Sequence, residues 1–471
     1  MEKVAKGAKS KITTPANQGK NKQNGTKSGF LKGAAWIAAG GFIAKLIGAL
    51  YRIPLTNLVG GYGLGLYQMV YPVYCMLLTV SATGIPSSIA KLTAERVGKG
   101  KTGIPVFKTA MRLFLLIGVV GTALMCLLAP FLAAAQGSRE VLGGYFTLAP
   151  SVLLVSAISV FRGYFQGKNN MMPTALSEIT EQAVKVGLGL LFAYLFRANV
   201  QRAVVFLLLA VSLSELAALF LMLFLFRRDP SPRISSKTEE KIPAKTVLKL
   251  SIPVTFSSII LPISGLLDSV LVPRFLGAYA ADAVTLFGLF SGGAVTVINL
   301  PVSICYGIAA ASVPAVAGAV ARKGRGTGRD ERISPRKRIL YSLLVTVAVA
   351  LPSAGALYLF AAPTAKIIFR ALSGEELRVL TDLIRVFSVS ALTLSCAQTL
   401  SACLTAQGKP QYAALSMLIG VTVKTGLYAW WLQNPKISVF GLAHATNICY
   451  LVAFLLNLVY NLIVSKEKRK E

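Results

Sequence analysis

Charged side chains are scarce in this sequence, and acidic ones are the scarcer kind. Only 14% of the 471 residues are Asp, Glu, Lys or Arg, with 18 acidic residues and one histidine in all. The six cysteines lie in apolar runs without the close spacing of metal ligands, so they indicate small apolar side chains. A chain of this length with 54% hydrophobic residues has too little polar surface for a water-soluble protein. The composition therefore predicts a membrane protein.

The apolar runs are about 20 to 25 residues long, which is the length that a helix needs to cross a hydrocarbon core of about 30 Å. These runs do not alternate apolar and polar residues, so helices and not strands are expected to span the bilayer. We predict an all-α polytopic membrane protein with twelve, and at most fourteen, spanning helices. The twelve predicted spans lie near residues 33–55, 66–90, 109–134, 143–165, 173–196, 203–226, 247–272, 283–312, 339–362, 379–405, 411–432 and 439–464.

Basic residues are abundant by contrast, and their distribution predicts the orientation. If the first 32 residues are cytoplasmic, the inside segments hold 34 of the 49 Lys and Arg and the outside segments hold 8. This asymmetry follows the positive-inside rule, so we expect both termini on the cytoplasmic side of the plasma membrane. The net charge of +31 lies mainly in short loops beside spans, which favours anionic inner-leaflet lipids over nucleic acid as the partner.

Two stretches of the chain repeat each other. The segment Gln166-Gly167-Lys168 returns as Gln407-Gly408-Lys409, and Lys185-Val186-Gly187-Leu188 returns as Lys424-Thr425-Gly426-Leu427. Six spans per half give both halves the same orientation, so a pseudo-two-fold axis along the membrane normal should relate two lobes around a central substrate path. The predicted divisions are a basic tail at 1–32, an N-terminal lobe at 33–226, a basic linker at 227–246, a C-terminal lobe at 247–464 and a basic tail at 465–471.

Cationic side chains inside the spans are the strongest indication of a site, because each would cost about 2.5 to 3.5 kcal/mol if it faced lipid at mid-bilayer. Arg112 and Arg162 lie close enough to cytoplasmic helix ends to reach the interface. Lys185 and Lys424 lie about a dozen residues into their helices, and Lys45 is similarly deep in the first span.

Arg52 lies two helical turns after Lys45 on the same face. We expect Lys45, Arg52, Lys185 and Lys424 to line a hydrated central cavity that binds an anion. The alternative for Lys185 is an ion pair with Glu181, whereas the repeat places Gly420 at that position for Lys424.

Two carboxylates, Glu215 and Asp268, also lie deep in predicted spans. Each is a candidate counter-ion for a buried cation or a candidate proton or sodium site. No cofactor is expected, and coupling to sodium, protons or the membrane potential stays open.

Several motifs resemble a known family. The runs Tyr51-Arg52-Ile53-Pro54-Leu55, Gly63-Leu64-Gly65-Leu66-Tyr67-Gln68-Met69 and Gly84-Ile85-Pro86 resemble the polysaccharide flippases of the stage V sporulation protein B type. Those proteins belong to the multidrug/oligosaccharidyl-lipid/polysaccharide exporter superfamily, together with MurJ-type lipid II flippases. The resemblance implies a two-lobed helical transporter, not an enzyme, that moves an undecaprenyl-pyrophosphate-linked sugar from the inner to the outer leaflet. It also implies that Lys45 matches a first-helix arginine in the MurJ-type cavity and that cell-envelope synthesis enzymes are candidate partners.

Two other classes of function remain as alternatives. A cation-coupled multidrug exporter of the same superfamily would place the coupling ion on Glu215 or Asp268 and would have an acidic cavity. A membrane glycosyltransferase or polymerase would need a sizeable loop with acidic or histidine catalytic groups, whereas the longest loops here are basic and about 20 residues long.

Overall fold

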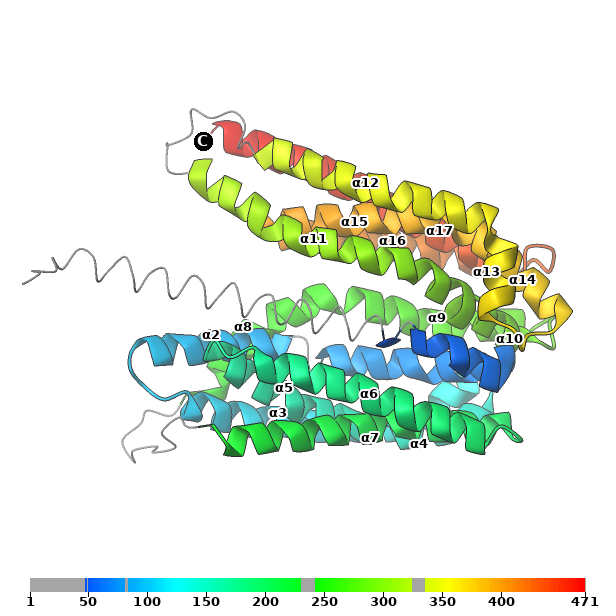
Figure 1. Ribbon diagram of the computed structural model, residues 1–471, viewed down its shortest axis with the longest axis horizontal. Helices are drawn as coiled ribbons and strands as arrows, with labels where there is room; N and C mark the ends of the chain where they lie inside the picture. Colours follow the sequence, from blue (N-terminus) through cyan, green and yellow to red (C-terminus); the bar gives the residue numbers. More distant parts are fainter. Residues whose placement is uncertain (1–46, 49, 81–83, 230–241, 324–334, 471) are drawn as a thin grey trace, which may run out of the picture.

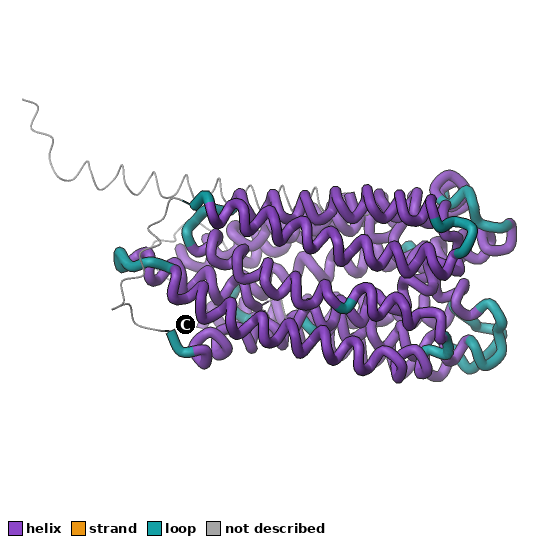
Figure 2. Tube along the Cα trace, turned by 90° about the horizontal axis from the view of Figure 1, so that it is seen from below, coloured by secondary structure: helices purple, strands orange, loops and turns teal. Residues whose placement is uncertain are grey.

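The computed structural model describes residues 47–48, 50–80, 84–229, 242–323 and 335–470. Helices account for nearly all of these residues, and the described part of the chain contains no strand (Figure 2). The first described helix covers residues 50–80, and the predicted all-α fold class is confirmed.

The remaining elements follow one another along the chain. They are α2 (Gly84–Gly98), α3 (Ile104–Ala135), the 3-10 helix η2 (Arg139–Val141), α4 (Leu142–Leu148), α5 (Pro150–Gly167), α6 (Met172–Leu195), α7 (Val200–Arg227), α8 (Ala244–Ser258), α9 (Ile260–Leu276), α10 (Ala283–Gly288), the π-helix η3 (Leu289–Ala294), α11 (Val295–Lys323), α12 (Pro335–Leu359), α13 (Ala361–Ile368), α14 (Gly374–Phe387), α15 (Val389–Ala406), α16 (Pro410–Trp431) and α17 (Phe440–Lys470).

The long helices run roughly along one axis and form two groups (Figure 1). One group holds α2 to α7, and the other holds α11, α12 and α15 to α17. Helices α8 and α9 lie between them, with α8 against α2 and α9 against α16. The C-terminus lies at the same end of the molecule as α2, whereas α10, α13 and α14 lie at the opposite end.

Eight helical segments of the described chain are long and apolar enough to cross a membrane. They overlap eight of the twelve predicted spans, at 109–134, 143–165, 203–226, 283–312, 339–362, 379–405, 411–432 and 439–464. The predicted start of the span at 379–405 is wrong, because the spanning segment begins at Val389 and residues 379–387 belong to α14. Of the other four, 173–196 forms the continuous helix α6, whose three charged residues make it more polar. Most of 33–55 lies outside the described residues.

Two predicted spans are interrupted where the sequence contains proline or glycine. The span near 247–272 is divided at Ile259 into α8 and α9, between Pro253 and Pro262. In the span near 66–90, helix 50–80 gives way to α2, which begins at Gly84. Proline lacks a backbone N–H and clashes with the preceding turn, so it divides a helix in this way.

The repeated Gln-Gly-Lys segments form the same type of connection in both halves. Helix α5 ends at Gly167 and α15 ends at Ala406, and each is followed by a residue with positive φ, Asn169 at 58° and Gly408 at 80°. The next helix, α6 or α16, then begins with a proline in its first turn. Proline is favoured there because the first helical N–H groups have no partner in any case.

Glycines allow the two groups of helices to touch at the end that carries α10. Gly65 packs so closely on α10 that a Cβ atom would overlap the carbonyl oxygen of Val284. A Cβ atom at Gly288 would likewise overlap the carbonyl oxygen of Gly61. The largest buried apolar cluster surrounds this contact and includes Leu66 from one side and Phe287 from the other. Backbone-to-backbone packing therefore joins the two halves at this end.

Replacing Gly65 with alanine should weaken this contact. The added methyl group would force the 50–80 helix away from α10, and overpacking of this kind costs about 1 to 3 kcal/mol. Thermal unfolding of the purified protein in detergent would measure the loss. Gly187→Ala is the matched control, because Gly187 lies in α6 with open space around it. Equal melting temperatures for the two variants would contradict the close contact.

Candidate functional site

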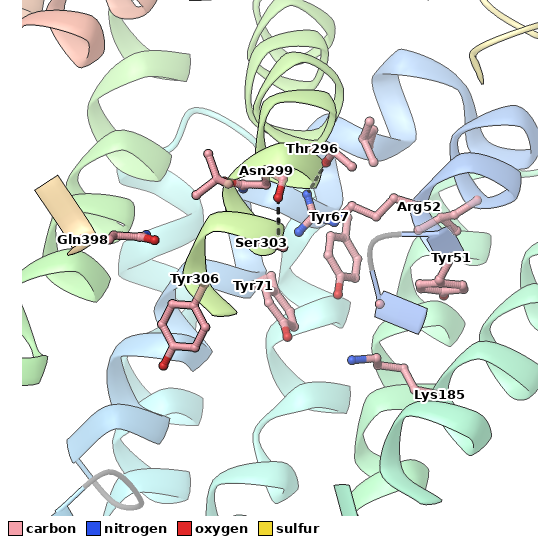
Figure 3. A pocket seen from close by; sticks show the side chains of 14 residues that line it. Tyr51, Arg52, Tyr67, Tyr71, Lys185, Thr296, Asn299, Ser303, Tyr306 and Gln398 are labelled. Atoms are coloured by element: carbon pink, nitrogen blue, oxygen red, sulfur yellow. Dashed lines mark hydrogen bonds between the residues drawn. The ribbon is translucent and has the colours of Figure 1, made fainter. Parts of the chain in front are cut away.

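A cavity of about 370 Å³ lies between the two groups of helices. Its lining comes from the 50–80 helix and α6 on one side and from α11 and α15 on the other. Two of the lining residues, Arg52 and Lys185, are cations, and none of the described residues that line it is acidic. Figure 3 shows the polar lining residues, which are Tyr51, Arg52, Tyr67, Tyr71, Lys185, Thr296, Asn299, Ser303, Tyr306 and Gln398.

Arg52 connects the two sides of the cavity. Its guanidinium donates a hydrogen bond from Nη1 to Thr296 Oγ1 on α11 at 2.9 Å (Figure 3). Thr296 in turn donates to the carbonyl oxygen of Gly292. A guanidinium has five N–H donors, so the single bond to Thr296 leaves most of them available to a ligand.

Lys185 reaches the same cavity from α6, and its ammonium group points toward the side that carries Tyr67 and Tyr71 (Figure 3). Glu181, one turn earlier, forms an ion pair with Arg162 at 3.2 Å, and Arg162 also donates to Ser177 at 2.9 Å. The direct ion pair of Glu181 is therefore with Arg162 and not with Lys185. Lys185 forms no ion pair with a described residue, and its side chain lines the cavity, while Glu181 and Glu215 act on its charge from a greater distance.

Polar side chains on one face of each helix complete the lining. Tyr67 and Tyr71 are one helical turn apart, and their rings stack at a centroid distance of 5.0 Å. On α11 the residues Thr296, Asn299 and Ser303 recur at spacings of three and four, so the helix presents all three on the same side. The Gln398 side-chain oxygen is buried and has no hydrogen-bond partner in the described structure.

These lining residues were not among the predicted site residues, although the sequence carried a signal for them. The signal is a helical spacing of polar residues within apolar spans, at 67 and 71 in one case and at 296, 299 and 303 in the other. It is weaker than a charge, because tyrosine, threonine and serine also occur in helix–helix contacts without a ligand.

Lys424 does not line this cavity, which corrects the expectation for its half of the repeat. It is only 4% exposed and forms an ion pair with Asp268 of α9 at 2.5 Å, together with a hydrogen bond to Ser264 at 2.9 Å. The acid that α16 itself lacks is supplied by a neighbouring helix. The structure thus places Asp268 as the counter-ion of Lys424, close to the hydroxyl of Tyr428.

Glu215 lies in α7, 3% exposed, beside the cluster of Arg162 and Glu181. The hydroxyl of Tyr74 donates to Glu215 Oε1 at 3.2 Å, whereas Oε2 has no hydrogen-bond partner in the described structure. A buried carboxylate oxygen without a partner is costly, so this position suits a proton or a small cation. Lys45, the remaining predicted cavity residue, lies outside the described residues. The described part of the chain contains no group of three or more His, Cys, Asp or Glu that could hold a metal ion.

The helix arrangement and this interlobe cavity define a class, the polytopic membrane proteins with the fold of MATE transporters. A solved structure described as the inward-facing conformation of a multidrug resistance MATE family transporter of the MOP superfamily matches with a TM-score of 0.76 at 16% identity. The match covers 89% of this chain and 95% of that one.

The family follows from the sequence comparison. The model of the family described as polysaccharide biosynthesis protein matches residues 30–319, and the chain belongs to this family. It is 27% identical to stage V sporulation protein B of Bacillus subtilis over 432 residues, which cover 89% of this chain and 81% of that protein. It is also 29% identical to the lipid II flippase MurJ of the same organism over 170 residues, 34% of this chain and 31% of that one.

Proposed function

We propose that this protein is a flippase that moves an undecaprenyl-pyrophosphate-linked sugar, lipid II or a related cell-envelope intermediate, from the inner to the outer leaflet. The observation that carries the proposal is a cavity between two lobes that holds Arg52 and Lys185 and no acidic side chain among its described lining residues. A diphosphate brings negative charge and many acceptor oxygens, which guanidinium and ammonium groups stabilise inside a membrane. The family membership and the similarity to MurJ support the same class of substrate.

The sign of the cavity charge argues against the export of cationic drugs. The one arginine and the one lysine of the lining would repel a cation, whereas an exporter of such compounds needs acidic groups at the site. A volume of about 370 Å³ is sufficient for a diphosphate with its nearest sugar. It is too small for an undecaprenyl chain, so the lipid tail would stay in the bilayer while the headgroup occupies the cavity.

The proposed cycle is alternating access without chemical conversion of the substrate. The N-terminal lobe (33–226) and the C-terminal lobe (247–464) would rock against each other and expose the cavity to each leaflet in turn. Both termini would lie in the cytoplasm, where the basic loops bind anionic lipids of the inner leaflet of the plasma membrane. Enzymes that make or polymerise the transported glycan are the proposed functional neighbours.

Purified protein in proteoliposomes tests this function directly. Vesicles would carry a labelled undecaprenyl-pyrophosphate-linked sugar in one leaflet, and a membrane-impermeant enzyme would report the fraction that appears in the other. We expect the labelled lipid to reach the other leaflet only when the protein is present. Less of it should reach that leaflet when unlabelled lipid-linked diphosphate is added in excess. Transport of cationic dyes, with no movement of the labelled lipid, would reject the proposal in favour of drug export.

Glu215 is the proposed coupling group. Because Glu215 Oε2 lacks a partner, Glu215→Gln should leave the protein folded while it removes the site at which a proton or cation binds. We expect the variant to transport at a rate that no longer responds to an imposed proton or sodium gradient. The same assay with the two gradients applied separately measures this. A gradient response equal to that of the unmodified protein would show that Glu215 does not couple transport.

A further inference from the structure

A second concave site lies at the end of the molecule opposite the C-terminus, on the short helices α13 and α14 (Figure 1). This groove has a volume of about 870 Å³ and is separate from the central cavity, with which it shares no lining residue. Three cations, Lys366, Arg378 and Arg385, and one acid, Asp382, line it, and all four are exposed.

Helix α14 is built to present these charges. It begins with a capping box, in which Ser373 and Glu376 each bond the other's backbone N–H. Its apolar face, with Leu380, Leu383 and Ile384, is fully buried against the bundle. The opposite face therefore carries the charged residues, at spacings of three and four, into the groove.

The groove has an excess of positive charge that the protein does not neutralise. Arg385 pairs with Asp382 at 3.1 Å, which uses the only acid in the lining. The side chains of Lys366 and Arg378 form no ion pair with a described residue. In addition, the segments predicted to lie outside hold only 8 of the 49 Lys and Arg, and three of these fall between residues 366 and 378.

Exposed apolar side chains lie next to this charge. Ile367 lines the groove and is 64% exposed, and the preceding helix α12 ends at Leu359, which is 72% exposed. The groove therefore lies where an apolar spanning helix ends, at the level of the lipid headgroups. A free anion would make no use of the apolar side chains, whereas a phospholipid would contact both surfaces.

We propose that this groove binds an anionic phospholipid, with its headgroup phosphate between Lys366 and Arg378 and its acyl chains along Ile367 and Leu359. The binding does not depend on the transport function. Under the predicted orientation the lipid belongs to the outer leaflet and holds α13 and α14 at the membrane surface.

Hydrogen–deuterium exchange of residues 361–387 in lipid nanodiscs provides the test. Nanodiscs that contain phosphatidylglycerol in phosphatidylcholine should slow exchange there relative to nanodiscs of phosphatidylcholine alone. In the double variant Lys366→Gln with Arg378→Gln, half-maximal protection should need about thirtyfold more phosphatidylglycerol. Each cation near an anionic lipid increases the affinity for that lipid by about fivefold, so the loss of two cations gives this factor. Both residues are exposed and unpaired, so the variant should fold normally.

The matched control is Arg336→Gln with Lys337→Gln, which removes two exposed cations at the start of α12, near the other end of the bundle. This control should keep the protection at 361–387. Protection that persists in the groove variant, or none in the unmodified protein, would overturn the proposal. Equal protection by inorganic phosphate in phosphatidylcholine nanodiscs would show that the groove binds a free anion. Stronger protection by an isoprenyl diphosphate than by phosphatidylglycerol would reassign it to the transported lipid.

Discussion

Replacing Arg52 with glutamine should reduce flipping of the labelled lipid-linked sugar by about tenfold to about a hundredfold. A hydrogen bond between a charged group and its partner contributes about 1.5 to 3 kcal/mol, and in the cavity this contribution depends on the guanidinium. Glutamine keeps a polar amide group but removes the positive charge that lines the cavity. The initial rate in proteoliposomes measures the effect.

Arg112→Gln is the matched control for this prediction. It removes the same charge from an exposed position in α3, away from the cavity, so transport should be nearly unchanged. Arg52→Lys should retain part of the activity, since an ammonium group keeps the charge without the planar arrangement of donors. A rate for Arg52→Gln that equals the rate for Arg112→Gln would show that the cavity charge does not bind the substrate.

Replacing Lys424 with methionine should have its main effect on stability. Asp268, whose side chain is 18% exposed, would remain partly buried without its counter-ion, and the loss of one partner of a fully buried ion pair costs about 3 to 5 kcal/mol, which is an upper bound here. The double variant Lys424→Met with Asp268→Leu removes both charges and should recover most of this loss, because apolar groups of similar size often replace a buried pair at little cost. Thermal unfolding of the three proteins in detergent measures these changes.

The transport rate of the double variant then separates two roles for the pair. If Lys424 and Asp268 only hold α9 against α16, the double variant should be stable and should transport at close to the normal rate. A stable double variant without transport would instead assign the pair to substrate binding or ion coupling. A single variant as stable as the unmodified protein would contradict the buried ion pair itself.

Much of the fold follows from local sequence. Apolar runs of membrane-spanning length predicted the helices, and eight of them overlap helical segments that can cross a membrane. The interruption that separates α8 from α9 lies between Pro253 and Pro262, within a segment predicted as one span. These properties depend on residues close together in the chain, which is why composition and spacing are sufficient to predict them.

The cavity was predicted only in part. Arg52 and Lys185 were chosen because charge deep in a span is costly, and the structure brings both to one cavity. The same argument failed for Lys424, because it favoured a hydrated cavity over a partner on another helix, although Asp268 was a candidate counter-ion. Asp268, which pairs with Lys424, comes from α9, 156 residues earlier in the chain. Sequence spacing within one helix carries no information on such a contact.

The sequence by itself determined the membrane environment, the helical fold and the internal repeat, because hydrophobicity and backbone hydrogen bonding in lipid act on each segment separately. Only the tertiary structure decided which of two equivalent lysines faces the cavity. Lys185 and Lys424 occupy matching positions in matching helices, but Glu181 is taken by Arg162 in one half and Asp268 approaches Lys424 in the other. The role of a buried charge depends on its nearest opposite charge, and helix packing sets that distance.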